Sequence, residues 1–279
     1  MSVTTKRTIN TGLIHLILGL YTLLALFPIL LILINAFKSR QGIFNDPLAL
    51  PNSTTFSTVG FNKVLDNSDF ILYFSNSLIV TLVSLFFILL LGAMVAWALT
   101  EYRFMGRRLL MVFMTMGIMV PIRLGTVSIL ETMVSLNLVN TITALVLVYI
   151  AQGLPLAIFI LSEYMAQIPK ELKEAARCDD VNEYKIFFQI ILPLTRPAIA
   201  TVAVFTMIPI WNDLWFPLIL APGEETRTLT LGVQQFIGQY VTDWNSVLAS
   251  LTLAVIPVLV LYMFFSRQLI RGLTSGAVK

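Results

Sequence analysis

The chain contains 279 residues, of which 57% are hydrophobic and 12% are charged, and its net charge is +3. A mean hydropathy of +0.87 excludes a soluble globular protein, because a water-facing surface this apolar would aggregate. The single cysteine excludes an internal disulfide framework, and the small net charge does not support a nucleic-acid partner. The composition therefore predicts an integral membrane protein whose surface contacts lipid.

Six segments are long and apolar enough to cross a hydrocarbon core, which requires about 20 helical residues. None shows the alternating polar and apolar pattern of a membrane β-strand, so we expect helices. The first segment follows Lys6 and Arg7 and is too long for a signal peptide, so we expect it to stay in the mature chain. The prediction is an all-α membrane protein with a single domain over residues 1–279. The expected spans are residues 12–37, 78–98, 109–130, 142–161, 197–220 and 247–266.

The distribution of basic residues predicts the orientation. A cytoplasmic N-terminus places 13 of the 18 Lys and Arg residues in inside segments and 5 in outside segments. Because basic residues concentrate in cytoplasmic loops, we expect both termini to be cytoplasmic. The expected external loops then cover approximately residues 38–77, 131–141 and 221–246, and the long cytoplasmic loop covers approximately residues 163–196.

Prolines interrupt most of the expected spans. Each proline removes a backbone donor and bends its helix, so neighbouring helices or a wet cavity must satisfy the freed carbonyl. Bent helices favour a bundle that moves, although static bundles also contain kinked helices. The prolines are Pro28, Pro121, Pro155, Pro209, Pro217 and Pro257.

The cytoplasmic loop predicts a short helix, a turn and a second helix. Pro169 suits the first position of the first helix, and Leu172, Ala175 and Ala176 have the spacing of one small apolar face. The charges around this face nearly cancel, whereas a helix that lies on anionic lipid is strongly basic. We therefore expect this helix to dock into a protein.

The turn follows at residues 178–182, where Asp and Asn favour turns and caps. Asp180 and Glu183 have the spacing of a capping box. A second amphipathic run covers residues 184–192, and we expect Pro193 to end it.

The same loop carries a motif. It reads Glu174-Ala175-Ala176, three residues, Asp180, nine residues, and then Ile190-Ile191-Leu192-Pro193. This pattern resembles the signature loop of permease subunits of ATP-binding-cassette (ABC) importers, in which glycine stands at the position of Asp180. Aspartate is among the residues that tolerate left-handed backbone geometry, so we expect the tight turn to survive. The resemblance implies that the ATPase-coupling residues are Glu174, Ala175, Ala176, Asp180, Ile190, Leu192 and Pro193.

Three further stretches are similar to the carbohydrate branch of this family, the smaller maltose-type permease in particular. They are residues 211–218 (WNDLWFPL), 228–232 (TLTLG) and 271–279 (RGLTSGAVK). The resemblance implies a type I ABC importer permease fold in the cell inner (plasma) membrane. It also implies a second homologous permease, two copies of a cytoplasmic ABC ATPase and an extracytoplasmic sugar-binding protein as partners.

No sequence feature supports catalysis in this chain. A phosphate-binding loop of the Gly-x-x-x-x-Gly-Lys-Ser/Thr type is absent, so we expect a non-enzymatic subunit whose ATPase partner binds ATP and Mg²⁺. His15 is the only histidine and has no cysteine or second histidine nearby, so we expect no metal site and no cofactor in this chain.

Asp213 stands within an apolar segment, where a charge costs roughly 2.5 to 3.5 kcal/mol on insertion scales. Trp211 and Asn212 adjoin it, and indole, amide and carboxylate groups suit a hydroxyl-rich sugar or polyol. Two roles stay open at this point: these residues border the substrate path, or they fix helices together. Arg123, near the outer end of the third span, is expected to snorkel or to contact a loop.

Two alternative functions remain at this point. An ABC importer permease for a non-sugar solute shares the loop motif and is disfavoured only by residues of the fifth span and the C-terminus. An ion-coupled secondary transporter accounts for Asp213 and the bent helices but leaves the loop motif unexplained.

Overall fold

The computed structural model describes residues 3–66, 69–237 and 242–275. These residues are helical, apart from loops and two isolated bridges that join Lys38 to Phe56 and Ile237 to Thr242. The chain divides into two compact units, described separately below. Unit 1 contains Met1–Ile71 and Val233–Ile256, and unit 2 contains Leu72–Gly232 and Pro257–Lys279. The single domain expected from sequence stays a prediction.

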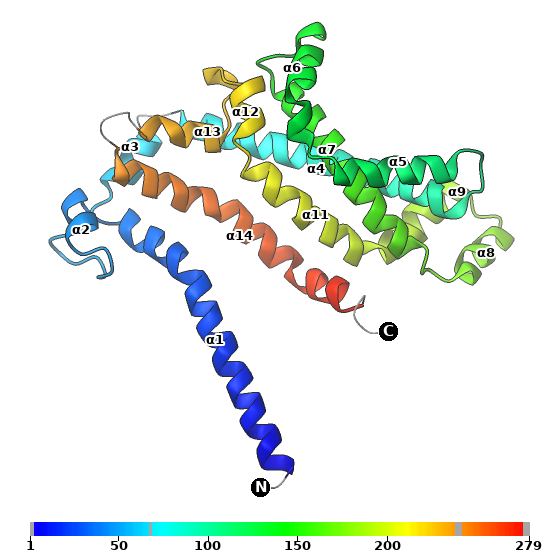
Figure 1. Cartoon of the computed structure of the whole chain (residues 1–279), viewed down its shortest axis with the longest axis horizontal. Helices are drawn as coiled ribbons and strands as arrows, with labels where there is room; N and C mark the ends of the chain where they lie inside the picture. The colour runs from blue at the N-terminus through cyan, green and yellow to red at the C-terminus, as the bar shows by residue number, and fades with distance from the viewer. Residues whose placement is uncertain (1–2, 67–68, 238–241, 276–279) are drawn as a thin grey trace. The chain divides into compact units, whose positions relative to one another are not determined.

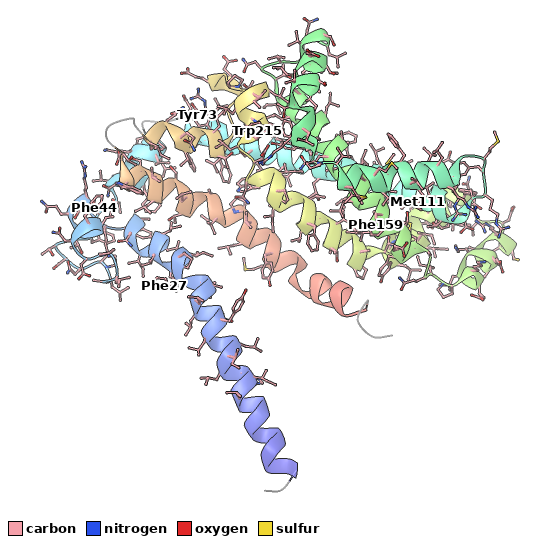
Figure 2. All side chains as sticks on the ribbon, in the orientation of Figure 1. Phe27, Phe44, Tyr73, Met111, Phe159 and Trp215 are labelled. Atoms are coloured by element: carbon pink, nitrogen blue, oxygen red, sulfur yellow. The ribbon has the colours of Figure 1, made fainter. Side chains whose placement is uncertain are left out.

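Unit 1 begins with one long apolar helix. Helix α1 covers Val3–Ala36 (blue in Figure 1), and its part Gly12–Ala36 is long and apolar enough to cross a membrane. No residue in the most apolar stretch of this helix is buried, and Phe27, labelled in Figure 2, is exposed on it. Such a surface is suited to lipid or to another membrane helix. The remaining elements of unit 1 are α2 (Arg40–Asn45), α3 (Val59–Asp66), η4 (Gln234–Phe236) and the first part of α14 (Trp244–Ser275).

A buried lysine joins the elements of unit 1. Lys38 is 1% exposed, and its Nζ donates hydrogen bonds to Asn35 Oδ1 at 3.1 Å and to the carbonyl of Asp46 at 2.9 Å. Asn245 of α14 donates its Nδ2 to the carbonyl of Lys38 at 2.7 Å. Lys38 therefore holds the loop after α1 through hydrogen bonds to a buried amide oxygen and to a partly buried backbone carbonyl.

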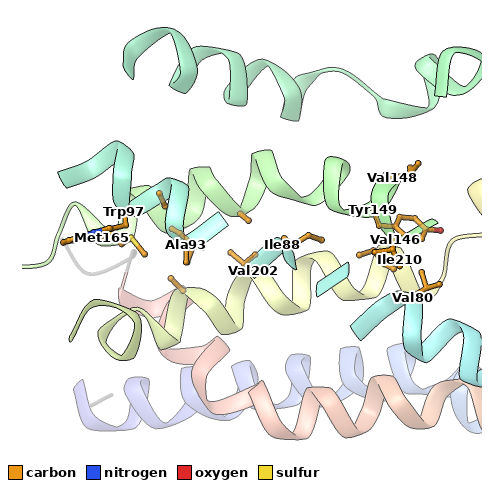
Figure 3. Packing of buried hydrophobic residues seen from close by; sticks show 14 of the residues in the cluster. Val80, Ile88, Ala93, Trp97, Val146, Val148, Tyr149, Met165, Val202 and Ile210 are labelled. Atoms are coloured by element: carbon orange, nitrogen blue, oxygen red, sulfur yellow. The ribbon is translucent and has the colours of Figure 1, made fainter. Parts of the chain in front are cut away.

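Unit 2 is built around α4 (Phe70–Glu101), α7 (Ile142–Met165) and α11 (Arg196–Trp211). Helix α7 contacts α5 and α11, and the close-up in Figure 3 shows Ile88, Tyr149 and Val202 among the buried residues that fill the core. A methyl group at Gly153 of α7 would lie 2.5 Å from Ile88 Cδ1, so a larger residue there would require the buried Ile88 side chain to shift. The other elements are α5 (Arg107–Met119), η1 (Ile122–Gly125), α6 (Thr126–Ser135), α8 (Lys170–Cys178), α9 (Glu183–Lys185), η2 (Ile186–Ile191), α10 (Leu192–Leu194), α12 (Trp215–Leu220), η3 (Glu224–Thr226) and α13 (Leu229–Val233).

The third expected span is not one straight helix. Helix α5 ends at Met119, and the helical path of Ile122–Ser135 continues at 90° to it. Pro121 lies at the break with extended backbone and lacks the N–H needed to continue α5. The sequence predicted a bend at this proline, but the structure shows a complete interruption.

The fifth expected span is also interrupted. Helix α11 ends at Trp211 and α12 begins at Trp215, so Asp213 lies in the break instead of within a helix. The Asp213 side chain accepts hydrogen bonds from the backbone N–H groups of Trp215 and Phe216, at 3.3 and 3.1 Å. An aspartate that caps the next helix in this way competes with continuation of the preceding one.

Not all of the six predicted spans are single long apolar helices in the structure. Among the described residues, 3 helices are long and apolar enough to cross a membrane, or up to 5 if each of two bent pairs is one span. The described part of α14 adds a shorter apolar helix, Trp244–Val260. Six spans and the orientation of the termini therefore remain predictions.

Candidate functional site

Helix α8, in the loop between the fourth and fifth expected spans, has two distinct faces. It covers Lys170–Cys178, and Pro169 lies just before it instead of at its first position. Lys173 and Ala176 are buried, whereas Glu174 and Ala175 are exposed. Ala176 therefore belongs to the inner face and not to the small exposed face expected from spacing, because positions three apart point the same way. The exposed apolar surface of α8 consists of Leu172 and Ala175.

The inner face of α8 is fixed to the end of α4 by a carboxylate. Lys173 Nζ lies 2.6 Å from Glu101 Oε2, and Arg177 Nη2 lies 2.7 Å from Glu101 Oε1. The side chains of Lys173 and Glu101 are only 9% and 11% exposed. The loss of either side chain would leave the other as a largely buried charge without a counter-ion, which is strongly destabilising.

The second partner of Arg177 comes from the helix that follows. Arg177 Nε lies 2.7 Å from Glu183 Oε1, and the hydroxyl of Tyr102 donates to Glu183 Oε2 at 2.8 Å. The hydrogen bonds from Arg177 to Glu183 and Glu101 raise the pKa of the guanidinium, and burial together with Glu183 raises the pKa of the Tyr102 hydroxyl. Both groups thus keep their protons at neutral pH, so the network is intact there.

Aromatic side chains back this network on one side. Lys173 Nζ lies 5.4 Å from the ring centroid of Trp97, and the ring of Trp97 lies 6.4 Å from that of Phe187. A cation over an indole face is favourable, most of all where water is scarce. Helix α8 is consequently attached to α4 and to the π-helical segment η2 as one rigid assembly.

The backbone at Asp180 confirms the expected left-handed turn. Its φ angle is 54°, and it follows the C-cap Asp179 of α8. The N–H of Asp180 donates to the carbonyl of Arg177 at 3.1 Å, and the N–H of Val181 donates to that of Ala176 at 3.0 Å. These two bonds form a Schellman motif, in which the left-handed position is the one that glycine usually occupies.

The second helical run begins and ends differently from the prediction. Asn182 caps α9 by accepting the N–H of Tyr184 at 2.8 Å, so the cap is not Asp180. Pro193 does not end the run, because π-helical geometry over Ile186–Ile191 leads into α10, which contains this proline. The N–H of Leu192 donates to the carbonyl of Phe187, five residues back, and this wider turn precedes the residue that has no N–H.

The Ile-x-Leu-Pro part of the motif is a packing element. Ile190 and Leu192 are partly buried against the core of unit 2, and Ile191 between them is fully buried. The helical path bends by 72° between the segment Glu183–Leu194 and helix α11. The motif thus anchors the bend that joins the loop containing α8 to α11.

Asp213 is held by groups from several helices. Its Oδ2 accepts a hydrogen bond from the Tyr149 hydroxyl at 2.9 Å, and its Oδ1 lies 3.4 Å from Arg123 Nη2. Thr230 Oγ1 donates to its backbone carbonyl at 2.7 Å. The Asp213 side chain is 8% exposed. These contacts support the interhelical alternative for Asp213, and they give Arg123 a partner instead of a purely snorkelling role.

The two neighbours of Asp213 differ in exposure. Trp211 is 3% exposed, and its ring meets that of Phe74 edge-on at 5.9 Å. Asn212 is exposed, and its Nδ2 donates to the carbonyl of Ile208 at 2.9 Å. Of the three residues singled out from sequence, only Asn212 offers side-chain surface to a passing solute.

Sequence reasoning missed the carboxylate and the hydroxyl that complete these two sites. Glu101 lies 72 residues before Lys173, and Tyr149 lies 64 residues before Asp213, so no local spacing connects them. One signal was present: Lys173 and Arg177 are four apart and share a helix face with Ala176, which indicates a common anionic partner. Within the described residues, no three His, Cys, Asp or Glu side chains gather to hold a metal ion.

Several long apolar helices, two bent helix pairs and a short helix that is ion-paired to the end of α4 are typical of a multi-pass membrane protein. Residues 88–275 match a family described as the inner membrane component of binding-protein-dependent transport systems, and the chain belongs to this family. The chain is 34% identical to a putative ABC transporter permease protein (ORF2) of Caldicellulosiruptor sp., over 94% of each chain. It is also 31% identical to the diacetylchitobiose uptake system permease protein NgcG of Streptomyces coelicolor, over 95% of this chain and 88% of that protein.

A solved structure shares the fold. It is a bacterial ABC transporter involved in the import of the acidic polysaccharide alginate, and it aligns with a TM-score of 0.80 at 22% sequence identity. The alignment covers 96% of this chain and 98% of the other. The type I importer permease fold expected from sequence agrees with this likeness.

Proposed function

We propose that this chain is the permease subunit of an ATP-driven importer of a sugar, either an oligosaccharide or a related polyol. Family membership supports the importer, and the relatives that are named for diacetylchitobiose and for arabinooligosaccharides support the class of solute. The proposed complex contains a second homologous permease, two copies of a cytoplasmic ABC ATPase and an extracytoplasmic sugar-binding protein. ATP and Mg²⁺ bind to the ATPase, and both termini of this chain face the cytoplasm.

The observation that carries the proposal is the division of α8 into a fixed and a free face. Lys173 and Arg177 hold the inner face to Glu101 at the end of α4. Ala175 and Glu174 on the outer face are exposed. A surface this small allows another backbone to approach closely, and the ion pairs transmit the resulting force to α4. The outer face is therefore the proposed ATPase-docking surface.

The experiment compares two alanines on opposite faces of α8. We expect Ala175→Trp to fold normally but to lower ATP-driven sugar uptake by about tenfold or more, because the indole separates the two backbones. Ala176→Trp is expected to destabilise the chain, because Ala176 is 7% exposed and packs in the core of unit 2. Uptake is measured with the complete complex in lipid vesicles, and assembly is measured by co-purification.

The conservative variant Ala175→Ser is the matched control and should transport at the normal rate. Normal uptake by a fully assembled Ala175→Trp complex would contradict the docking surface. Uptake driven by a proton or sodium gradient in vesicles without the ATPase would contradict the importer itself and favour an ion-coupled transporter.

For the sugar path, we propose that Asn212 contributes and that Asp213 sets its position. The exposed amide of Asn212 adjoins the break that Asp213 holds through Tyr149. Asn212→Ala should change the sugar concentration for half-maximal uptake in an intact complex. Asp213→Asn should lower the yield of assembled complex and leave this concentration unchanged in what remains. The reverse pattern would place Asp213 in contact with sugar.

A further inference from the structure

A basic pocket lies beside α8, within unit 2, and it extends from Lys173 and Arg177 on the inner face to Glu174 at the edge of the proposed docking surface. It has a volume of about 360 Å³, which falls within the usual range of ligand pockets of about 300–1,000 Å³. Its walls come from the end of α4, from the connection to α5 and from α8. The lining residues are Thr100, Glu101, Arg103, Arg107, Lys170, Lys173, Glu174 and Arg177.

The pocket carries more positive charge than its own carboxylates neutralise. Glu101 is taken up by Lys173 and Arg177, and Arg177 is shared with Glu183, so this group of four charges is balanced. The other charged lining residues are three basic side chains and one acidic side chain: Arg103, Arg107, Lys170 and Glu174. None of these four forms an ion pair with another side chain in the described part of the chain. Convergent cations without an internal partner attract an anion into a concave site.

The connection beside the pocket is apolar and exposed. Met105 projects fully, with an exposed fraction of 101%, and Phe104 and Leu109 are exposed as well. Leu109 belongs to α5, which forms half of one of the bent pairs that are apolar enough to span a membrane. An anion held in this pocket would lie next to side chains that are suited to hydrocarbon, an arrangement that fits a lipid headgroup better than a soluble anion.

We propose that this pocket binds the phosphate headgroup of an anionic phospholipid. Arg103, Arg107 and Lys170 contact the headgroup, and Phe104, Met105 and Leu109 contact the adjoining acyl chains. Basic residues near a membrane surface attract anionic lipid, each contributing about fivefold in affinity. The lipid then rests against the same helix pair, α4 and α8, that Glu101 joins. Bound lipid fills the space between the α4–α5 connection and α8.

The test uses the full chain in detergent micelles, titrated with phosphatidylglycerol or with phosphatidylcholine that has the same acyl chains, and counts bound lipids by native mass spectrometry. We expect phosphatidylglycerol to bind about tenfold or more tightly than phosphatidylcholine. The pocket variant Arg103→Gln/Lys170→Gln should lose this preference. The matched control Arg108→Gln/Lys185→Gln removes the same charge from α5 and α9, at two residues that do not line the pocket, and should keep the preference.

Three results would overturn the inference. These are equal binding of the two lipids, equal losses in the pocket and control variants, and binding of free glycerol phosphate as tight as that of phosphatidylglycerol, which would indicate a soluble anion. If the pocket variant loses helix content, the single variant Arg103→Gln decides, because Arg103 lies outside any helix. Lipid binding is measured on this chain alone, so its failure is distinct from failure of the proposed transport function.

Discussion

Replacement of Asp180 tests the Schellman turn without disturbing any packing. The Asp180 side chain is exposed, while its backbone has a φ angle of 54°. A left-handed conformation costs most L-residues about 1–2 kcal/mol, and aspartate less. Asp180→Gly removes this cost but adds unfolded-state entropy of about 0.5–1 kcal/mol, so it should be neutral or stabilise by about 1 kcal/mol at most. Asp180→Val introduces the full cost of a left-handed conformation and adds the stiffness of a β-branched side chain. It should therefore destabilise the chain by about 1–3 kcal/mol.

The assay is chemical denaturation of the purified chain in detergent micelles, followed by ATPase coupling in the reconstituted complex. Asp180→Asn serves as the control, because asparagine also tolerates left-handed geometry. The expected order of stability is glycine at least equal to aspartate and asparagine, with valine clearly lowest. The valine variant should also couple poorly, because the turn sets the direction from α8 to α9. Equal stability of the glycine and valine variants would refute the turn argument.

Three further perturbations address the fixed charges. Glu101→Gln should destabilise the chain by about 3 kcal/mol, because Lys173 stays covered without its carboxylate; denaturation checks this, and an unchanged midpoint would show that the pair is dispensable. Lys38→Met should destabilise by about 1–3 kcal/mol, since it leaves the buried Asn35 amide oxygen and the partly buried carbonyl of Asp46 without their donor, and a neutral result in the same assay would contradict this. The pKa of Asp243 is lowered, since hydrogen bonds from Lys63 and Ser246 outweigh burial, which raises it. Its contribution to stability is therefore complete above its ordinary pKa of 3.8 and declines as pH falls through the lower folded value. The difference in Tm between wild type and Asp243→Asn should thus shrink below about pH 4, and a difference that is independent of pH would contradict the ion pair.

The sequence predicted the membrane class and most helix positions because lipid requires apolar residues along the whole length of a span. Residues 142–161 were expected to form the fourth span, and α7 covers Ile142–Met165. The break in span five escaped detection because a hydropathy average does not register a single polar residue, whereas Pro121 predicted a bend in span three but not its complete interruption. Asp213 accepts the N–H of Phe216 at the start of α12, and its contacts with Tyr149 and Arg123 are visible only in three dimensions.

At the candidate site, the sequence predicted the features that depend on neighbouring residues but not those that depend on contacts between distant ones. The left-handed turn at Asp180 followed from a motif position and from the tolerance of aspartate, both of which are local. The burial of Ala176 within this chain was not predicted, because Leu172, Ala175 and Ala176 were expected on one face that docks into a partner protein. Its burial depends on Glu101, whose place at the end of α4 brings a carboxylate over the helix. Only the tertiary fold brings Glu101 close to Lys173.

Helix α7 connects the two sites of unit 2 described above, the break at Asp213 and helix α8. Near its start, Tyr149 binds Asp213 at the break between α11 and α12, and beyond its end the chain enters α8, which Glu101 holds. Pro155 lies between these points and weakens the helix where it can bend. A force on the outer face of α8 therefore has two routes into the spans, through α4 by the ion pairs and through α7 by the chain itself. Because the Tyr149 hydroxyl binds Asp213 and the Tyr149 ring packs edge-on against Phe216, movement of α7 acts directly on the segment proposed to border the sugar path.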